Sequence, residues 1–423
     1  MSKRRPESGI VVIWVLLALA LSACTRQSQP TQAEPVRVSG VGVDAAEPAV
    51  AAASDGSFYL AWVEHHAHGG GDVMLAAFAA TGESNGPAIR VNPTAGAAGA
   101  WRGDPPAVSV APDGTVYVTW TARAESGATD LYLSASRDRG QSFELPSKVN
   151  DDQKPGAHGM HSLAVSADGS IFVSWLDEQN EAVSVKAGKK GHKHGAEANR
   201  ELFVASSNDG GKTFSANQLI AREVCPCCKT SLATAPGGRV YVSWRQVLPG
   251  DLRHIAVASS SDQGKTFSAP IIVSDDQWTI AGCPVSGASL SVSSDRMLQV
   301  LWYSAGEAGP TGIYRSESRD AGKSFAPRQL VAEGQAQGTP VLLPYLKGSI
   351  AIWQGDLGSN AHVNTAYLGD NLSVPTVFHK EANSELPAAS LVHDQILVAY
   401  IHQGAANDQR SVWLLKKAAK AGP

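Results

Sequence analysis

A short apolar unit that ends in an aromatic residue recurs along the chain and constrains its fold more than any other feature. The clearest copies read EPAVAAASDGSFYLAW (47–62), PPAVSVAPDGTVYVTW (105–120), HSLAVSADGSIFVSW (161–175) and KTSLATAPGGRVYVSW (229–244). Weaker copies read GASLSVSSDRMLQVLW (287–302), TPVLLPYLKGSIAIW (339–353) and LPAASLVHDQILVAY (386–400). Alternation of apolar and polar residues around a tight turn predicts a β-hairpin whose terminal aromatic side chain is buried. Such repetition predicts an all-β architecture built from small sheets.

A second motif, Ser-x-Asp-x-Gly-x-Ser/Thr-Phe, follows several of these units. Its copies are SRDRGQSF (136–143), SNDGGKTF (207–214), SSDQGKTF (260–267) and SRDAGKSF (318–325). We expect the aspartate of each copy to accept backbone N–H groups across a turn, and the glycine to supply a positive φ. The phenylalanine should pack against the neighbouring sheet. The aspartates with this predicted structural role are Asp138, Asp209, Asp262 and Asp320.

The second motif resembles the Asp box, or bacterial neuraminidase repeat, of sialidase-like β-propellers. The resemblance covers residues 35–418 and implies an all-β propeller of four-stranded blades. Counting hairpins gives seven blades, and six, as in true sialidases, is the alternative. The predicted propeller starts with the strand-like segment PVRVSG (35–40), and its last strand-like segment is SVWLLK (411–416). We therefore expect the N-terminal strand to complete the last blade and close the ring.

The N-terminus predicts a location outside the cytoplasm. Three basic residues precede the apolar run GIVVIWVLLALALSA and then Cys24, which predicts a signal peptide over 1–24. The segment LSAC resembles the lipobox of bacterial lipoproteins, which implies that Cys24 carries a lipid anchor in a membrane. An ordinary secretory signal is the alternative. Residues 25–34 predict a flexible tether. Thr25 then favours the outer membrane, so the resemblance implies the bacterial cell envelope, on its periplasmic side or at the cell surface.

The charge balance argues against nucleic acid as a partner. The formal net charge is −4, and only 17% of the residues are charged. Nucleic-acid binding requires a concentrated basic surface, which this composition does not provide.

Cysteines mark the most unusual stretch of the chain. Cys225, Cys227 and Cys228 lie in REVCPCCKTSL, and Cys283 lies in AGCPVSG. Cys225 precedes one repeated tryptophan by 19 residues, and Cys283 precedes the next by the same 19. The two segments therefore occupy equivalent loops of adjacent predicted blades, and we expect the four cysteines to meet.

Three interpretations of these cysteines stay open. Two disulfides would staple the loops, because disulfides persist outside the cytoplasm. A metal site is the second, because thiolates with nearby imidazole and thioether groups suit copper or zinc. His158 and His161, on either side of Met160, lie in a neighbouring loop of the same face. The third is a redox-active thiol. The histidine-rich loops at 65–72 and 191–195 map to this face as well.

The sialidase resemblance also implies a set of catalytic residues. Sialidases of this fold clamp the substrate carboxylate with three arginines and use a tyrosine nucleophile and an aspartate acid/base. Glu47 stands where the first arginine is expected, which disfavours an ordinary clamp. The remaining candidates are Asp72 as the acid, Arg102 and Arg245 as a substitute clamp, and Tyr303 as the nucleophile. Ordinary blade-edge arginines are the alternative.

The Cys-Pro-Cys-Cys and Gly-Cys-Pro loops resemble those of a subgroup of secreted sialidase-like bacterial proteins. Three functions fit this likeness, because fold alone does not establish function. The first is a lipid-anchored propeller that binds a metal ion, a glycan or an envelope protein at its Cys/His-rich face. The second is an exo-sialidase-type glycoside hydrolase with an altered arginine clamp. The third is a scaffold lipoprotein whose cysteines are purely structural.

Overall fold

The structure of this protein is a computed structural model. It describes residues 1–2, 34–99, 103–124, 128–152, 154–179, 199–280, 284–369, 372–404 and 409–419. Several predicted features lie outside these residues, namely the signal peptide with Cys24, most of the tether, Arg102, the 191–195 loop and Cys283. The chain divides into two units, Met1–Ala33 and Glu34–Pro423, and all strands belong to the second.

The all-β prediction is confirmed. In the described ranges every regular element is a β-strand except η1 (Gly358–Asn360), a short 3-10 helix. All strand pairs within them are antiparallel, as hairpin repeats require. The described residues contain no helix with the length and apolar character needed to cross a membrane.

Two large sheets, of nine and eight strands, contain β2 to β18. One sheet contains β2 (Asp44–Ala52), β3 (Phe58–His65), β4 (Gly71–Phe78), β5 (Ile89–Arg90), β6 (Ala98–Gly99), β7 (Ala107–Val110), β8 (Val116–Arg123), β9 (Thr129–Ser136) and β10 (Ser147–Lys148). The other contains β11 (His158–Val165), β12 (Ile171–Asp177), β13 (Arg200–Ser207), β14 (Gln218–Val224), β15 (Ser231–Ala235), β16 (Arg239–Leu248), β17 (Leu252–Ser260) and β18 (Ile271–Ile272). In each sheet, two groups of four consecutive strands are bridged, through β6 in the first and by the β14–β16 pair in the second.

Three further sheets have four strands each. The first contains β19 (Ala288–Val292), β20 (Leu298–Ser304), β21 (Gly312–Ser318) and β22 (Gln329–Glu333). The second contains β23 (Ala336–Tyr345), β24 (Gly348–Gly355), β25 (His362–Leu368) and β26 (Thr376–His379). The third has the order β1-β29-β28-β27 and contains β1 (Val36–Arg37), β27 (Ser384–Val392), β28 (Gln395–His402) and β29 (Ser411–Ala418).

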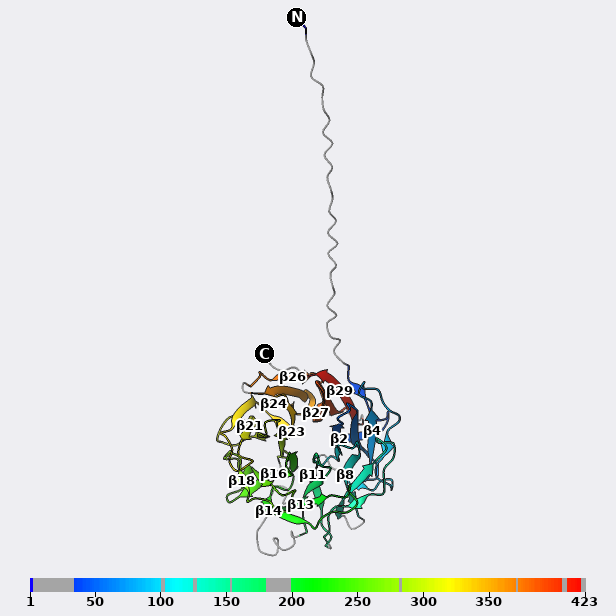
Figure 1. Cartoon of the computed structure of the whole chain (residues 1–423), viewed down its shortest axis with the longest axis vertical. Coiled ribbons are helices and arrows are strands. Elements are labelled where there is room, and N and C mark those ends of the chain that lie inside the picture. Colours follow the sequence, from blue (N-terminus) through cyan, green and yellow to red (C-terminus); the bar gives the residue numbers. More distant parts are fainter. Residues whose placement is uncertain are drawn as a thin grey trace. The chain divides into compact units, whose positions relative to one another are not determined.

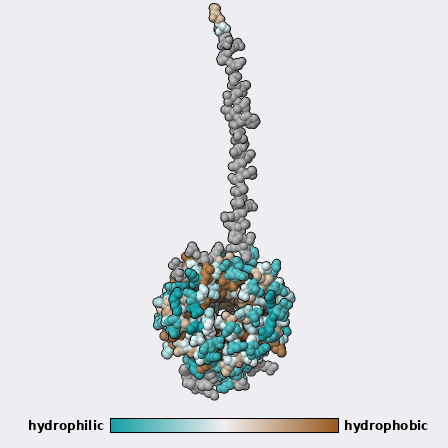
Figure 2. All heavy atoms as spheres, in the orientation of Figure 1, coloured by the Kyte–Doolittle hydropathy of each residue, from teal (hydrophilic) through white to brown (hydrophobic). Residues whose placement is uncertain are grey.

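The sheets of Glu34–Pro423 are arranged radially around a central opening (Figure 1), with β2, β11, β23 and β27 near the opening. The space-filling view shows a hollow at the same place (Figure 2). Strand β1 pairs with β29, opposite Trp413 and Leu414, so the N-terminal end of the chain contributes a strand to the C-terminal sheet. This pairing covers a strand edge that would otherwise be open.

The core lies between successive sheets and contains the repeated aromatic residues. All seven are buried, with exposures from 0% to 4%: Trp62, Trp120, Trp175, Trp244, Trp302, Trp353 and Tyr400. Each packs into a cluster that joins two neighbouring groups of strands, as Trp302 does with Tyr241 and Val257. The repeat therefore supplies one large apolar side chain to each junction between sheets.

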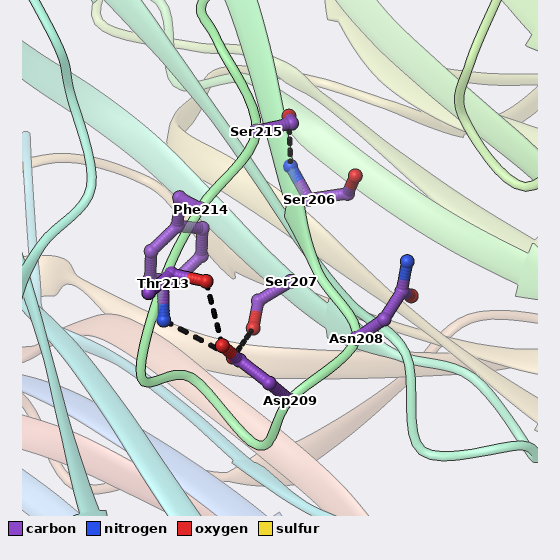
Figure 3. A pocket seen from close by; sticks show the side chains of 7 residues that line it. All are labelled: Ser206, Ser207, Asn208, Asp209, Thr213, Phe214 and Ser215. Atoms are coloured by element: carbon purple, nitrogen blue, oxygen red, sulfur yellow. Dashed lines mark hydrogen bonds between the residues drawn. The ribbon is translucent and has the colours of Figure 1, made fainter.

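The four aspartate turns share one hydrogen-bond pattern, seen around Asp209 in Figure 3. Asp209 Oδ1 accepts the backbone N–H of Thr213 at 3.1 Å, and Oδ2 accepts the Thr213 hydroxyl at 2.6 Å. Oδ1 also accepts the backbone N–H of Lys212 at 3.0 Å. The Ser207 hydroxyl donates to the same carboxylate at 2.8 Å. Corresponding contacts hold Asp138, Asp262 and Asp320. A surface depression of about 380 Å³ lies beside the Asp209 turn and is lined by the turn itself.

Candidate functional site

The loop that carries three cysteines is fixed at both ends by neighbouring strands. Strand β14 ends at Val224, and the Cys225 N–H then donates to the Arg245 carbonyl on β16 at 2.9 Å. At the other end, the backbone N–H and the hydroxyl of Thr230 both donate to the Met160 carbonyl on β11, at 3.0 and 2.9 Å. The loop is therefore tied to its own group of strands and to the preceding one.

The three sulfur atoms form a compact buried group. Cys225 and Cys228 are 0% exposed, Cys227 is 2% exposed, and all three pack in one cluster with Met160 and Trp244. Cys225 Sγ lies 3.3 Å from Cys228 Sγ and 4.0 Å from Cys227 Sγ. Cys225 and Cys228 are free thiols, whereas Cys227 does not carry a free thiol.

The closest pair has the spacing Cys-x-x-Cys. Sequence reasoning grouped the cysteines but did not single out Cys225 with Cys228. The two residues between Cys225 and Cys228 let a turn bring these two side chains together. The Cys227 sulfur lies farther from Cys225, at 4.0 Å. The spacing was the signal that could have identified the pair.

Two arginines surround the thiol pair. Arg253 on β17 donates from Nη1 to Cys225 Sγ at 3.2 Å, and its Nη2 pairs with Asp251 Oδ1 at 2.9 Å. Arg245 on β16 is 0% exposed, and its guanidinium stacks 4.7 Å from the centre of the Trp278 ring. Both positive charges favour the ionised form of Cys225.

This environment separates the two thiols in acidity. The hydrogen bond from Cys228 lowers the pKa of Cys225 to about 6 despite burial, and the charges of Arg253 and Arg245 act in the same direction. Burial, together with the neighbouring Cys225, raises the pKa of Cys228 well above its usual value. Cys225 is therefore a thiolate at neutral pH, the form that binds metals and attacks disulfides.

The two histidines predicted near the cysteines pair with carboxylates instead. His158 Nε2 lies 3.0 Å from Asp152 Oδ1 and 3.1 Å from Asp177 Oδ2. His161 Nδ1 lies 3.0 Å from Asp104 Oδ1, and its Nε2 faces the Thr119 carbonyl at 3.2 Å. Neither belongs to the group of cysteine ligand atoms in the described part of the chain.

Asp130, Asp152 and His158 form a second group close enough to surround an ion. The Asn150 amide nitrogen, however, donates into this group, to Asp130 Oδ1 at 2.9 Å and to Asp152 Oδ1 at 2.7 Å. Its amide oxygen is already used by the Leu131 N–H at 2.8 Å. Because a donor occupies the centre, the group is best described as a buried hydrogen-bonded ion cluster.

The candidates for sialidase chemistry occupy structural positions. The Arg245 guanidinium donates to the Ser286 carbonyl at 2.9 Å and to the Tyr303 carbonyl at 3.1 Å. It therefore binds backbone oxygens of the protein. The Tyr303 hydroxyl donates to Gln335 Oε1 at 3.0 Å, and burial raises the pKa of this phenol. A nucleophilic tyrosine needs the opposite shift.

Asp72 and Glu47 are likewise held by local contacts. Asp72 Oδ1 accepts the Asn92 amide at 2.8 Å and the Gly96 N–H at 2.9 Å, and Asn92 in turn caps the Val73 N–H. The same aspartate–asparagine arrangement recurs one group of strands later, which marks it as part of the repeat. Glu47 is buried and its Oε2 lies 2.5 Å from His65 Nε2.

Comparison with known proteins places the fold. An ulvan lyase of the polysaccharide lyase family PL25, bound to -[GlcA(1-4)Rha3S]-, superposes with a TM-score of 0.59 at 12% identity, over 91% of this chain and 97% of that one. A protein of unknown function from Dyadobacter fermentans gives 0.54 at 15% identity, over 92% and 98%. A Hadza microbial sialidase gives 0.50 at 12% identity, over 82% and 73%. No protein-family model matches the chain, and neither does any curated protein.

At these identities the likeness shows the fold alone. The ulvan lyase and the sialidase are β-propeller enzymes that degrade glycans, and this chain shares their β-propeller fold. Their substrates say nothing direct about its site, because the same fold supports unrelated chemistries.

Proposed function

We propose that this protein is an extracytoplasmic seven-bladed propeller that binds a thiophilic metal ion between Cys225 and Cys228. The observation that carries the proposal is the 3.3 Å approach of two buried free thiols in a Cys-x-x-Cys segment beside two arginines. Grouping the strands by four, with β1 completing the last group, supports the proposal of seven blades.

The donor chemistry supports a soft metal. Cysteine thiolates select ions such as Cu(I) and Zn(II) over hard cations such as Mg(II) or Ca(II). The Arg253 contact at 3.2 Å stabilises a ligand that is already deprotonated. The fixed loop ends hold Cys225 and Cys228 close together before an ion arrives, which reduces the entropy lost on binding.

The third cysteine, Cys227, has a structural role in this proposal. Cys227 carries no free thiol, and Cys283 stands at the equivalent position of the next predicted blade. We infer a Cys227–Cys283 disulfide, which would join two adjacent blades and leave Cys225 and Cys228 for the metal. Peptide mapping without reduction tests this pairing. Recovery of Cys227 and Cys283 as separate alkylated peptides would contradict it.

Lipid attachment at Cys24 and residence in the bacterial envelope are part of the proposal and rest on the N-terminal sequence. A metal site on a tethered propeller suits a protein that meets ions or an envelope partner outside the cytoplasm. The exo-sialidase alternative rests on the fold, because Arg245 and Tyr303 already bind protein groups.

The metal proposal is tested with the chain from residue 25 onward, purified from a periplasm. We expect one thiophilic ion per chain when the protein is titrated with Cu(I) against a competing chelator. Cys225→Ser and Cys228→Ser should each reduce this affinity at least 100-fold, because a two-sulfur site loses half its ligands. Ser215→Ala, directly after the turn that contains Asp209, serves as the control. A wild-type protein that takes up neither Cu(I) nor Zn(II) nor Cd(II) would overturn the proposal.

A further inference from the structure

We infer that the site is built for a soft monovalent cation, Cu(I), rather than for Zn(II). This inference rests on the proposed metal-binding function and specifies the charge and coordination of its ion. It follows from the charges that the fold buries next to Cys225 and Cys228.

Arg245 is the decisive residue. Its side chain is 0% exposed, yet its contacts in the described structure are neutral: the Ser286 and Tyr303 carbonyls and the Trp278 ring. Its Nη1 has no hydrogen-bond partner among the described atoms. A fully buried guanidinium without a counter-charge is costly, so an anionic group must compensate it. The neighbouring thiolates are the groups that can do so.

Arg253 is already compensated. It lies 2.9 Å from Asp251 Oδ1 through Nη2, and its Nε contacts the same oxygen at 3.3 Å. The pair is close to neutral as a unit, while the remaining Nη1 orients towards Cys225 Sγ at 3.2 Å. Arg253 therefore positions the sulfur, and Arg245 sets the net charge around it.

The sum of these charges selects the ion. A metal-bound pair of thiolates carries two negative charges, and Arg245 contributes one positive charge that nothing else among its described contacts cancels. The buried group then carries one net negative charge before the ion is counted. A monovalent cation makes it neutral, whereas a divalent cation leaves a net positive charge in a low-dielectric interior.

Coordination number points the same way. Zn(II) takes four ligands in structural sites, or three with an open position in catalytic ones. In the described chain the sulfur group offers three cysteines, and Cys227 has no free thiol to give. Two thiolates suit a soft ion with a low coordination number. With metal–sulfur bonds of about 2.3 Å, a linear pair spans about 4.6 Å, so the two sulfurs must separate by about an ångström on binding.

The test compares two ions on the wild-type protein and on a matched pair of variants. Cu(I) and Zn(II) affinities of the chain from residue 25 are measured anaerobically by chelator competition, with Ag(I) as a second monovalent probe. We expect Cu(I) to bind at least 1,000-fold more tightly than Zn(II), and one equivalent of Ag(I) to block it. Cys228→Ser should abolish the preference.

Arg245→Met removes the buried charge and keeps most of the volume. We expect the ratio of Cu(I) to Zn(II) affinity to fall at least tenfold in this variant. Arg239→Met, at the partly exposed start of the same strand β16, should leave the ratio unchanged. Circular dichroism monitors folding, and Arg245→Lys, which keeps the charge, should retain the wild-type ratio.

The outcomes separate this inference from the proposed function. Equal affinity for Zn(II) and Cu(I) in the wild-type protein would overturn the monovalent site and leave metal binding intact. An unchanged ratio in a folded Arg245→Met variant would overturn the inference that the Arg245 charge selects the ion, and would also leave metal binding intact. Failure of every thiophilic ion to bind would overturn both the monovalent site and the proposed metal-binding function.

Discussion

At the residue scale, the buried His158 is held between two carboxylates. His158 is 3% exposed and sits between Asp152 and Asp177, while its Nδ1 donates to the Thr129 carbonyl. Burial alone would disfavour the charged imidazole. The hydrogen bond and charge of Asp177 and the charge of Asp152 outweigh it and raise the pKa of His158 from 6.5 to about 8.

This shift predicts a pH-dependent contribution to stability. Because the folded pKa is above the unfolded one, the stabilisation is fully present below pH 6.5 and is lost as the pH rises through 8. Its size is about 2 kcal/mol, since one pKa unit corresponds to about 1.4 kcal/mol. Urea unfolding of the wild type and of His158→Gln should differ by about this amount at pH 6 and converge above pH 9.

His68→Gln provides the comparison, because His68 is exposed. It should follow the wild type at both pH values. A His158→Gln variant whose deficit stays constant from pH 6 to pH 9 would show that His158 is uncharged in the folded protein.

The sequence predicted the cysteine cluster as a group but could not predict its electrostatics. Cys225 and Cys228 are close in sequence, so their approach was readable from spacing. Arg245 and Arg253 reach them only because β16 and β17 pair with Gln246 opposite His254, which places residues from both strands beside the loop. That register depends on the hairpin, and the burial of Arg245 depends on the next sheet. Both are properties of the assembled fold.

At the scale of elements, the repeat was the best predictor. The short apolar runs before Trp62, Trp120 and Trp175 located strands β3, β8 and β12, which are buried on both faces over most of their length. The short outer strands were harder to bound. Strands β5, β10 and β18 have two residues each, so they carry no periodicity of their own.

Each aspartate turn should contribute to stability on its own. In Asp209→Ala, four protein hydrogen bonds to one carboxylate are lost, those from Lys212 N, Thr213 N and the hydroxyls of Thr213 and Ser207. We expect a loss of about 1–2 kcal/mol, reduced by solvent screening at this exposed turn. Chemical denaturation measures it.

Asn208→Ala, at the exposed neighbouring position, should change the unfolding free energy by less than about 0.5 kcal/mol. Equal effects of the two substitutions would mean that the turn tolerates loss of its carboxylate. The Asp209 contacts would then be a consequence of the turn and not a cause.

At the scale of the whole molecule, contacts between the two ends of the described chain complete the last sheet. Strand β1 pairs with β29, and the Val38 N–H donates to the Val412 carbonyl at 2.9 Å. An ion pair reinforces the junction, because Arg410 Nη2 lies 2.7 Å from Asp44 Oδ2. Strand β1 thus completes a sheet whose other three strands, β27, β28 and β29, come from the C-terminal part of the chain.

Removal of this strand should destabilise the propeller. A variant lacking residues 25–40 exposes the edge of β29 (Ser411–Ala418), so we expect its Tm to fall by roughly 5–10 °C and its tendency to self-associate to rise. Differential scanning calorimetry and size-exclusion chromatography measure both. A variant lacking only residues 25–33 should match the chain from residue 25. Identical behaviour of the two truncations would show that β1 is dispensable.

The β1–β29 pairing also determines when the last sheet can form during synthesis of the chain. During synthesis the chain emerges from its N-terminus, so β1 appears first. Its partner β29 is made only after nearly all of the other strands. Groups of strands such as β11–β14 can assemble from neighbours as they appear, while the final sheet depends on the most distant contact in the chain. During that interval the segment around Val36 and Val38 is an unpaired strand.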